Sequence, residues 1–294
     1  MDWRAAVEDF LSELRAKGSA NNTIIAYRND LNQLVSYLAV ALPEDATWSS
    51  VTLAVLQDYV KQLAEQHYSA STIARKVAAL KTFFHGLVQY GLIAEDPAPQ
   101  LRAPKVEKHV PRLLSQEEVG RLLEAVSKNG ARNAQRDRAL LEVIYATGMR
   151  VSEAINLRIG DVDLEANVVR CATGTRQRTI PLTAQAAAAL RAYLDGARRD
   201  MTTLSGDDYV FINPSGRRIT RQSVWQITRH YAQAAGLSSE LTPHTLRHSR
   251  AAHMLNAGED VRRVQAWLGH ANLATTQMYR LQSSASNNSS SDQL

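Results

Sequence analysis

The sequence contains a single cysteine, Cys171, among its 294 residues. One thiol cannot form an internal disulfide framework or supply a cysteine-rich zinc site. No apolar run approaches the roughly 20 residues that a membrane-spanning helix requires. The N-terminus shows no basic stretch followed by an apolar segment, as a secretory leader would. We therefore expect a cytoplasmic protein without a membrane partner.

The sequence also lacks the motifs of a Mg²⁺ site and of a nucleotide-binding site. No run of acidic residues resembles a Mg²⁺ site, and no glycine-rich loop followed by lysine resembles a nucleotide phosphate loop. We therefore expect no metal and no cofactor, and a reaction that is independent of metal and ATP.

Lysine is absent after Lys128, which is the last of the seven lysines, and every later Lys or Arg position is arginine. Residues 1–110 contain 11 Lys and Arg against 12 Asp and Glu, whereas residues 111–294 contain 23 against 17. A compositional bias explains the preference for arginine as well as a chemical cause does. The concentration of positive charge in the second part favours a polyanionic partner there.

Hydrophobic periodicity predicts an all-helical first domain over residues 1–95. Apolar residues recur at helical spacing in four segments joined by short connections. These segments are residues 7–14, 24–38, 53–66 and 71–91.

Residues 96–111 separate this domain from the rest of the chain. They contain four prolines and three basic residues. Because proline fixes φ and removes a hydrogen-bond donor, the composition predicts an extended linker. A basic linker could lie along a phosphate backbone, although a solvated hinge would have the same composition.

The second predicted domain, residues 112–282, combines helices with a small β region. Ser115 and Glu118 have the spacing of a capping box that begins a helix. A strongly apolar helix is predicted over residues 138–147. The fold class is therefore mainly α, with a small β-sheet in the C-terminal domain.

The β region is predicted from residues that alternate between apolar and polar. Strands are expected at residues 168–171 and 179–182 around a turn at 173–175, with a candidate third strand at 209–212. Residues 283–294 are rich in Ser, Asn, Gln and Asp and are expected to be disordered.

Four short segments of the second domain carry residues that suit phosphate chemistry. Arg150 follows a helix-ending glycine, and His244 and Arg247 have the spacing that puts both on one helix face. His270 follows another glycine, and Tyr279 comes nine residues later. Singly, such residues are usually structural or lie on the surface. Together they indicate a phosphate site, because guanidinium binds phosphate oxygens bidentately and a tyrosine hydroxyl can attack phosphorus.

The order ATGMRVSE, HTLRHS, LGH and then Tyr279 resembles the tyrosine recombinase (phage integrase) family, most closely the bacterial Xer recombinases. The resemblance covers nearly the whole chain. It implies a SAM-like helical core-binding domain followed by a mixed α/β catalytic domain. It also implies a site-specific recombinase acting on double-stranded DNA that carries a specific recombination site. Such enzymes act as homo- or hetero-tetramers on two DNA sites.

The resemblance assigns a role to each of the catalytic candidates. Arg150 and Arg247 would clamp the scissile phosphate, and His270 would donate a hydrogen bond to it. His244 would assist proton transfer at Tyr279, whose oxygen would form a 3′-phosphotyrosyl link and release a 5′-hydroxyl.

Three further residues belong to the implied site. Glu153 would orient the other side chains. Thr173 stands where the family has a hairpin lysine that protonates the leaving oxygen, and no later lysine replaces it. Arg176 could stabilise charge there, but a guanidinium with a pKa above roughly 12 is a poor proton donor. Because general acid–base catalysis contributes about 10²–10⁴-fold, we expect slow cleavage rather than none.

Several functions remain open from the sequence. The recombinase could resolve chromosome or plasmid dimers, as Xer proteins do, or serve a mobile element as its integrase. A catalytically impaired DNA-binding relative with an architectural or regulatory role is the main alternative, and a relaxing topoisomerase is another. Base contacts are expected from helices that include the segment around Arg217, Arg218, Arg221 and Gln222, where a plain polar surface is equally compatible.

Overall fold

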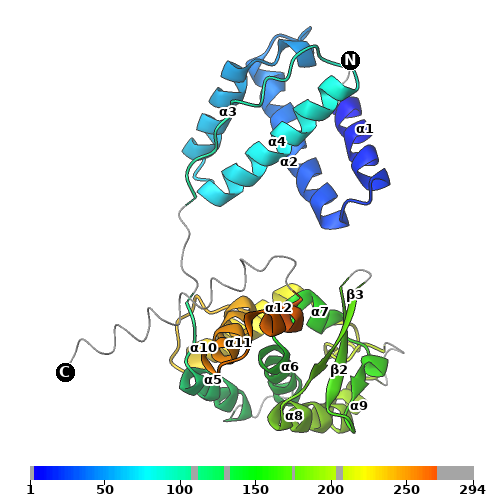
Figure 1. Cartoon of the computed structure of the whole chain (residues 1–294), viewed down its shortest axis with the longest axis vertical. Helices are drawn as coiled ribbons and strands as arrows, with labels where there is room; N and C mark the ends of the chain where they lie inside the picture. Colours follow the sequence, from blue (N-terminus) through cyan, green and yellow to red (C-terminus); the bar gives the residue numbers. More distant parts are fainter. Residues whose placement is uncertain (1–2, 107–111, 129–132, 174–175, 203–207, 270–294) are drawn as a thin grey trace, which may run out of the picture. The chain divides into compact units, whose positions relative to one another are not determined.

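The computed structural model of the chain describes residues 3–106, 112–128, 133–173, 176–202 and 208–269, the side chains of Thr173, Arg176 and Thr202 excepted. The chain divides into two compact units, residues 1–109 and 110–294 (Figure 1). Among the described helices, none combines the length and the apolarity that crossing a membrane requires.

The N-terminal unit is a bundle of four helices, as predicted. Its helices are α1 (Trp3–Ala16), α2 (Asn21–Ala41), α3 (Leu53–Glu65) and α4 (Ala70–Gln89), with a 3-10 turn, η1 (Trp48–Ser50), before α3. The Thr52 side chain caps α3 and the Ser69 side chain caps α4. The apolar faces of the four helices meet in one core that contains Phe83 and Phe84.

The proline-rich segment after α4 is only partly the linker that its composition predicts. It is irregular as expected, but Ala98 and Leu101 are buried in the core of the N-terminal unit. Lys81 of α4 also donates a hydrogen bond to the carbonyl of Pro99 at 2.9 Å. The segment therefore belongs to the N-terminal unit at least as far as Leu101, because its few apolar side chains complete that core.

The C-terminal unit contains the remaining described α-helices and a 3-10 turn, η2 (Ile159–Asp161). The α-helices are α5 (Gln116–Lys128), α6 (Ala134–Thr147), α7 (Val151–Asn156), α8 (Ala184–Asp195), α9 (Ala197–Thr202), α10 (Arg221–Ala234), α11 (Pro243–Asn256) and α12 (Val261–Leu268). The predicted capping box of α5 is confirmed, with the Ser115 amide donating to Glu118 Oε2 at 2.9 Å and the Glu118 amide to Ser115 Oγ at 3.1 Å.

A three-stranded antiparallel sheet accompanies these helices. Its strands are β1 (Val162–Asp163), β2 (Val168–Thr173) and β3 (Arg176–Pro181), in the order β1-β2-β3. The predicted strands at 168–171 and 179–182 are confirmed as β2 and β3. The candidate third strand at 209–212 is wrong, because its backbone forms only isolated bridges. One part pairs with residues 157–158 and the other with residues 218–219, which leaves no continuous ladder.

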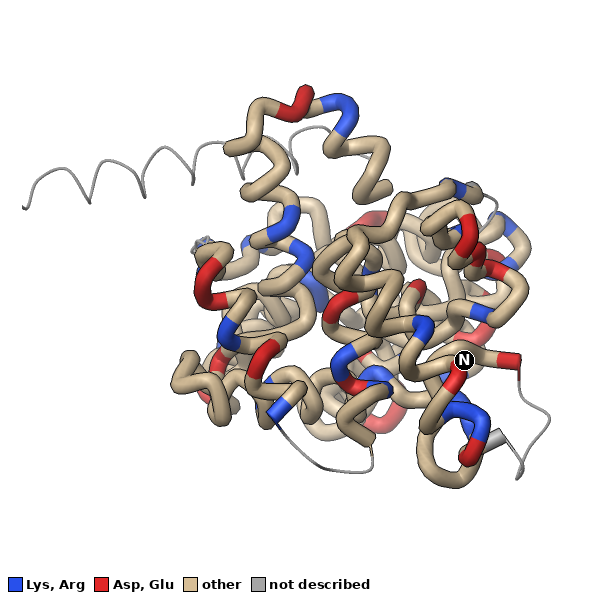
Figure 2. The backbone as a smooth tube through the Cα atoms, turned by 90° about the horizontal axis from the view of Figure 1, so that it is seen from below, with Lys and Arg blue, Asp and Glu red and all other residues tan. Residues whose placement is uncertain are grey.

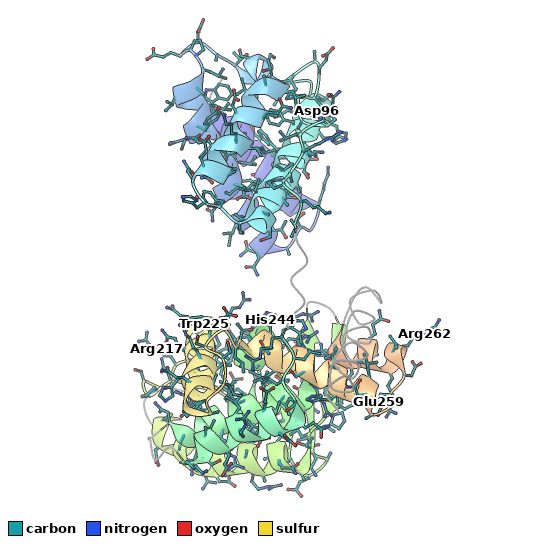
Figure 3. All side chains as sticks on the ribbon, turned by 90° about the vertical axis from the view of Figure 1, so that its left-hand side faces the viewer. Asp96, Arg217, Trp225, His244, Glu259 and Arg262 are labelled. Carbon is teal, nitrogen blue, oxygen red and sulfur yellow. The ribbon has the colours of Figure 1, made fainter. Side chains whose placement is uncertain are left out.

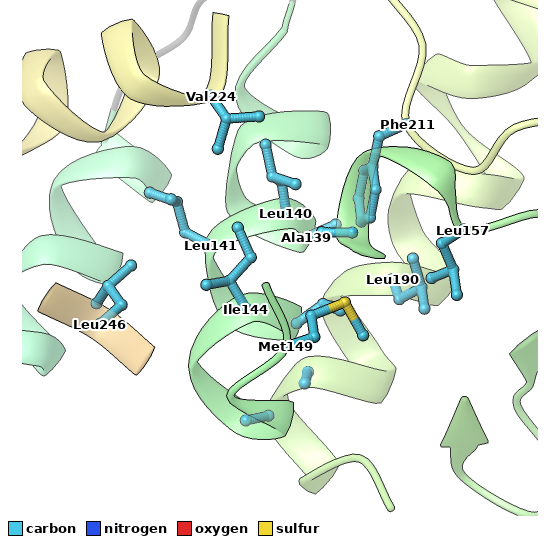
Figure 4. Packing of buried hydrophobic residues seen from close by; sticks show 14 of the residues in the cluster. Ala139, Leu140, Leu141, Ile144, Met149, Leu157, Leu190, Phe211, Val224 and Leu246 are labelled. Atoms are coloured by element: carbon cyan, nitrogen blue, oxygen red, sulfur yellow. The ribbon is translucent and has the colours of Figure 1, made fainter. Parts of the chain in front are cut away.

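Helix α6 lies at the centre of the C-terminal core. It packs against α5, α8 and α11, and Leu140, Leu141, Val143 and Ile144 are fully buried. Figure 4 shows this packing, with residues from other elements around α6, among them Leu190, Phe211, Val224 and Leu246. The second half of α6 is almost entirely buried and has little freedom to move, so the chain that follows α6 starts from a fixed point.

Candidate active site

Arg150 lies at the junction between α6 and α7. Gly148 ends α6 in the left-handed conformation with φ of 60°, and a Cβ atom there would lie 2.6 Å from Cδ2 of Leu268. Only glycine satisfies both conditions, since other residues are strained at positive φ and no side chain fits. Arg150 follows as the N-cap of α7, so the end of α6 and the start of α7 together define its position.

Glu153 is the buried centre of the site, with a side chain that is 3% exposed. Its carboxylate accepts hydrogen bonds from the Arg150 amide at 2.6 Å and from Arg150 Nη1 at 3.2 Å. Arg178 Nη1 and Nη2 donate to the two carboxylate oxygens at 2.9 and 3.0 Å, which makes a bidentate pair. A third guanidinium, through Arg247 Nη1, lies 4.0 Å from Glu153 Oε2. One carboxylate therefore faces three arginines.

Helix α11 carries His244 and Arg247 on one face, as their spacing predicts. The Thr242 side chain caps the helix. Arg247 is buried and donates hydrogen bonds to the carbonyl oxygens of Gly148 and Leu268, the second at 2.7 Å. His244 remains exposed. The two side chains thus differ in exposure. Arg247 is buried and bonded to two backbone carbonyls, whereas His244 is accessible to a substrate.

Two histidines of α11 remain neutral at neutral pH. The rings of His244 and His248 have centroids 6.1 Å apart. Partial burial of the His244 ring lowers its pKa, and the cations Arg247 and Arg150 lower it further. Burial, followed by His244 and Arg247, lowers the pKa of His248 to about 4. A neutral imidazole at position 244 can accept a proton from a nearby hydroxyl.

The one thiol of the chain does not provide a second nucleophile. Cys171 is buried on β2. Burial, followed by the charge of Glu153, raises the pKa of Cys171 to about 12. The thiolate, which is the reactive form, is therefore not populated near neutral pH.

Some of the predicted site lies outside the described residues. This applies to all of His270 and Tyr279 and to the side chains of Thr173 and Arg176. The backbones of Thr173 and Arg176 pair with each other at the end of the β2–β3 hairpin. The structure brings Arg150, Glu153 and Arg247 together. The catalytic roles of all the candidate residues stay predictions.

Arg178 is a member of the site that the sequence analysis missed. Its position on β3 matches that of Ile180, two residues further, which is buried. Because alternate residues of a strand point to the same face, a cation at this position must be directed inward. The sequence signal that could have identified Arg178 as a site residue is therefore an arginine at a position that faces the buried side of a predicted strand.

The segment predicted to contact bases forms the start of α10 and the turn before it. Arg217, Arg221 and Gln222 are exposed, and Arg218 donates a hydrogen bond to Asn156. The exposed ring of Trp225 carries the guanidinium of Arg229 at 5.2 Å from its centroid. In Figure 3, Arg217, Trp225 and His244 lie toward the same side of the C-terminal unit.

These features define a class of protein. A helical unit is followed by an α/β unit in which arginines and an exposed neutral histidine surround a buried carboxylate, an arrangement suited to phosphodiester chemistry. Models of the phage integrase family and of the phage integrase N-terminal SAM-like domain match residues 112–285 and 7–91. The chain belongs to the phage integrase family, that is, to the tyrosine recombinases.

Individual relatives are Xer proteins. The tyrosine recombinase XerC of Herpetosiphon aurantiacus is 44% identical over 275 residues, which are 93% of this chain and 89% of the relative. The tyrosine recombinase XerD of Oceanobacillus iheyensis is 37% identical over 277 residues, 93% of this chain and 92% of the relative. A similar solved structure is that of the XerH site-specific recombinase bound to its difH substrate before cleavage. It has a TM-score of 0.72 and 25% identity, and the match covers 94% of this chain and 83% of that chain.

Proposed function

We propose that this protein is a site-specific tyrosine recombinase that cuts and rejoins double-stranded DNA through a 3′-phosphotyrosyl intermediate at Tyr279. The observation that carries this proposal is the convergence of Arg150 and Arg247 around the buried Glu153. Two arginines in fixed orientations offer the planar donors that a phosphodiester requires. The relatives named XerC and XerD support the same function.

In the proposed reaction, the Tyr279 oxygen forms a bond to phosphorus and the bond between phosphorus and the 5′ oxygen breaks. Arg150 and Arg247 stabilise the charge that develops on the non-bridging oxygens. His244 accepts the tyrosine proton, which its lowered pKa permits because the imidazole is neutral before the reaction. The phosphodiester energy is kept in the protein–DNA bond, so rejoining reverses the step without metal or ATP.

The sequence provides no evident donor for the proton that the leaving 5′ oxygen needs. Thr173 occupies the position of the family's hairpin lysine. Arg178 of the same hairpin does not replace it, because a guanidinium is a poor proton donor and this one is held by Glu153 and the carbonyl of Trp267. We therefore propose that cleavage is slow, with Arg176 giving electrostatic support.

DNA contact is proposed to involve the exposed start of α10. Basic and acidic residues are interspersed in the view of Figure 2, so we propose that binding depends on local clusters of basic residues. Arg221 and Gln222 are exposed in the first turn of α10, where side chains can reach base edges in a major groove. Arg217 and Trp225 extend this surface.

The test is a covalent-trapping experiment. Genomic fragments retained by the protein are trimmed by footprinting to a bound site, and that site is rebuilt as a duplex nicked beside each position that could be cleaved. We expect a protein–DNA adduct in EDTA and without ATP, and none with Tyr279→Phe. A bound site that gives no adduct would overturn the proposal in favour of an architectural DNA-binding protein. Relaxation of a supercoiled plasmid that lacks the site would favour a topoisomerase.

We further propose that the active assembly is a tetramer of identical or mixed subunits on two DNA sites, in the cytoplasm. Its task is the resolution of chromosome or plasmid dimers or the integration of a mobile element. Sedimentation of the protein with one and with two copies of the site measures the stoichiometry. Deletion of the gene separates the two tasks, since accumulated chromosome dimers indicate the first and loss of element transfer the second.

A further inference from the structure

Three arginines from three elements bind the C-terminal end of α12. Arg178 Nε of β3 donates to the carbonyl of Trp267 at 2.9 Å, and Arg247 Nη2 of α11 donates to that of Leu268 at 2.7 Å. Arg150 Nη2, at the start of α7, donates to the carbonyl of Gly269 at 2.9 Å. Three consecutive carbonyls are thus each bound by a different guanidinium.

A helix end of this kind has a physical reason to attract cations. The last carbonyls of a helix have no partner within it, and they form the negative end of the helix dipole. Gly269 ends α12 with φ of 65°, and a Cβ atom there would lie 3.0 Å from Arg178 Nη1. The glycine therefore lets the guanidinium approach the backbone closely. The residue after this glycine is His270, so the anchored helix end is also where the segment that contains His270 and Tyr279 begins.

All three guanidinium nitrogens of Arg178 are bonded inside the protein. Its side chain is 16% exposed. Nη1 and Nη2 hold the two oxygens of Glu153, and Nε holds Trp267. Lysine could not replace it, because a single ammonium cannot bind a carboxylate bidentately and a separate carbonyl in this fixed geometry.

We propose that Arg178 is a positioning residue of the recombinase site. It joins Glu153 to the end of α12, so that Arg150 keeps its orientation and the chain carrying His270 and Tyr279 starts from a fixed place. Arg178 itself touches neither the phosphate nor the leaving group. This inference rests on the proposed function, which it deepens.

The test compares Arg178→Lys with the wild-type full-length protein on the nicked substrate. A displacement of about 1 Å in a catalytic group costs about 10²-fold in rate, so we expect adduct formation at saturating protein to slow about 10²-fold, with the dissociation constant for the same DNA within about twofold. Arg170→Lys is the matched control, because Arg170 is an exposed arginine on the neighbouring strand β2, and it should cleave at the wild-type rate. Wild-type cleavage by Arg178→Lys would overturn the proposal, as would a loss confined to DNA affinity.

Two further measurements separate positioning from other roles. The first measurement combines Arg178→Lys with Glu153→Gln in a double variant. If Arg178 acts through Glu153, the double variant should cleave only a little more slowly than the slower of the two single variants. If the two residues act independently, their rate losses should multiply. A substrate with sulfur at the bridging 5′ position has a leaving group that needs no proton. The Arg178→Lys defect should persist on it, and full rescue would make Arg178 the proton donor and overturn the proposal.

A readout without DNA keeps this inference distinct from the proposed function. Amide hydrogen exchange in α12 should be faster in Arg178→Gln than in the wild type, and unchanged in Arg170→Gln. Unchanged exchange in α12 of Arg178→Gln would overturn the anchoring role even if the enzyme is active. Absence of any wild-type adduct would instead overturn the proposed function and leave the exchange result standing.

Discussion

Glu153 is surrounded by more positive charge than one carboxylate neutralises. Arg150 and Arg178 bond to it and Arg247 lies 4.0 Å away. Arginine stays protonated at any physiological pH, so this cluster keeps an excess of positive charge. A DNA phosphate would supply the missing negative charge. The buried carboxylate therefore holds the guanidiniums together in the absence of substrate without cancelling their attraction for it.

At the scale of single residues, Thr173→Lys tests the missing proton donor. An ammonium at the end of the β2–β3 hairpin would supply a group with a pKa low enough to protonate the leaving oxygen. General acid catalysis contributes about 10²–10⁴-fold, so we expect faster adduct formation on ordinary DNA, by about 10-fold or more. On the 5′-bridging sulfur substrate, the variant and the wild type should cleave at equal rates.

The matched variant for this prediction is Arg176→Ala. An unchanged rate in Thr173→Lys combined with loss of cleavage in Arg176→Ala would mean that Arg176 serves the leaving group. In that case the objection based on the high pKa of arginine is wrong.

His248 makes the C-terminal unit sensitive to acid. Its pKa is lowered to about 4 in the folded protein, against about 6.5 in an unfolded chain. Between these values the unfolded chain binds more protons, so stability falls as the pH decreases from 6.5 towards 4 and is unaffected above that range. An NMR titration should place the His248 midpoint near 4, and His248→Gln should lose less stability between pH 7 and 5 than the wild type. A midpoint near 6.5 would contradict this.

At the scale of elements, polar side chains of α11 and α6 hold the segment with which the C-terminal unit begins. The Leu114 amide donates to Ser249 Oγ at 2.8 Å, and the Leu114 carbonyl lies 2.9 Å from His253 Nε2. His253 Nδ1 in turn lies 2.8 Å from the Tyr145 hydroxyl on α6. With Nε2 protonated, the neutral ring donates to the carbonyl and accepts from the tyrosine. Burial lowers the pKa of His253, which favours this neutral form.

His253→Ala should therefore destabilise the C-terminal unit. It leaves the buried Leu114 carbonyl and the Tyr145 hydroxyl without these partners, at a cost of about 1–3 kcal/mol for each such group. Tyr145→Phe removes one hydrogen bond and no carbonyl partner, so its loss should be smaller. Urea unfolding of the two variants measures both effects, and an equal or larger loss in Tyr145→Phe would contradict this account.

The β region shows what element-level patterns can and cannot predict. Alternation located β2 and β3, because their buried residues Val169 and Ile180 pair across the hairpin. The short apolar run at residues 209–212 suggested a third strand, which does not join the sheet. Local pattern indicates which residues are buried, but the partner of each backbone group depends on chain segments far away in the sequence.

At the scale of the whole molecule, each unit has a core of its own, and the N-terminal core contains a buried ion pair. The Asp30 side chain is 1% exposed and accepts a hydrogen bond from Lys76 Nζ at 2.8 Å. Arg75 binds the other carboxylate oxygen, and Lys76 also donates to Gln33 Oε1 at 2.6 Å. The ammonium of Lys76 depends on this carboxylate, because a buried charge without a partner is costly.

Asp30→Asn should destabilise the N-terminal unit by about 3–5 kcal/mol, the usual cost of removing one partner of a buried pair. Since the two cores share no residue, we expect calorimetry to show the loss in one transition while the transition of the C-terminal unit stays in place. Adding Lys76→Met should recover much of the loss. A uniform shift of both transitions would contradict the independence of the units.

Much of the molecule follows from its sequence. The four N-terminal helices, the capping box of α5 and the grouping of Arg150, Glu153 and Arg247 agree with the structure, because each depends on local spacing or on a motif. Arg178 escaped prediction, since its role depends on which face of β3 is buried and on where α12 ends. The packing of the proline-rich segment could not be predicted for a related reason. Its composition indicates an irregular chain, which is observed, but not that Ala98 and Leu101 complete the N-terminal core.

The position of Leu113 and Leu114 has a mechanical consequence. Leu113 packs against α11 and α12, and both peptide groups of Leu114 are tied to side chains of α11. A pull on the chain just before Arg112 would therefore act on α11 and α12, which carry His244, Arg247 and the anchored carbonyls. It would also act on α5, where Glu118 accepts a hydrogen bond from Arg112 at 3.1 Å. Tension applied at the start of the C-terminal unit would therefore reach the candidate active site through α11 and α12.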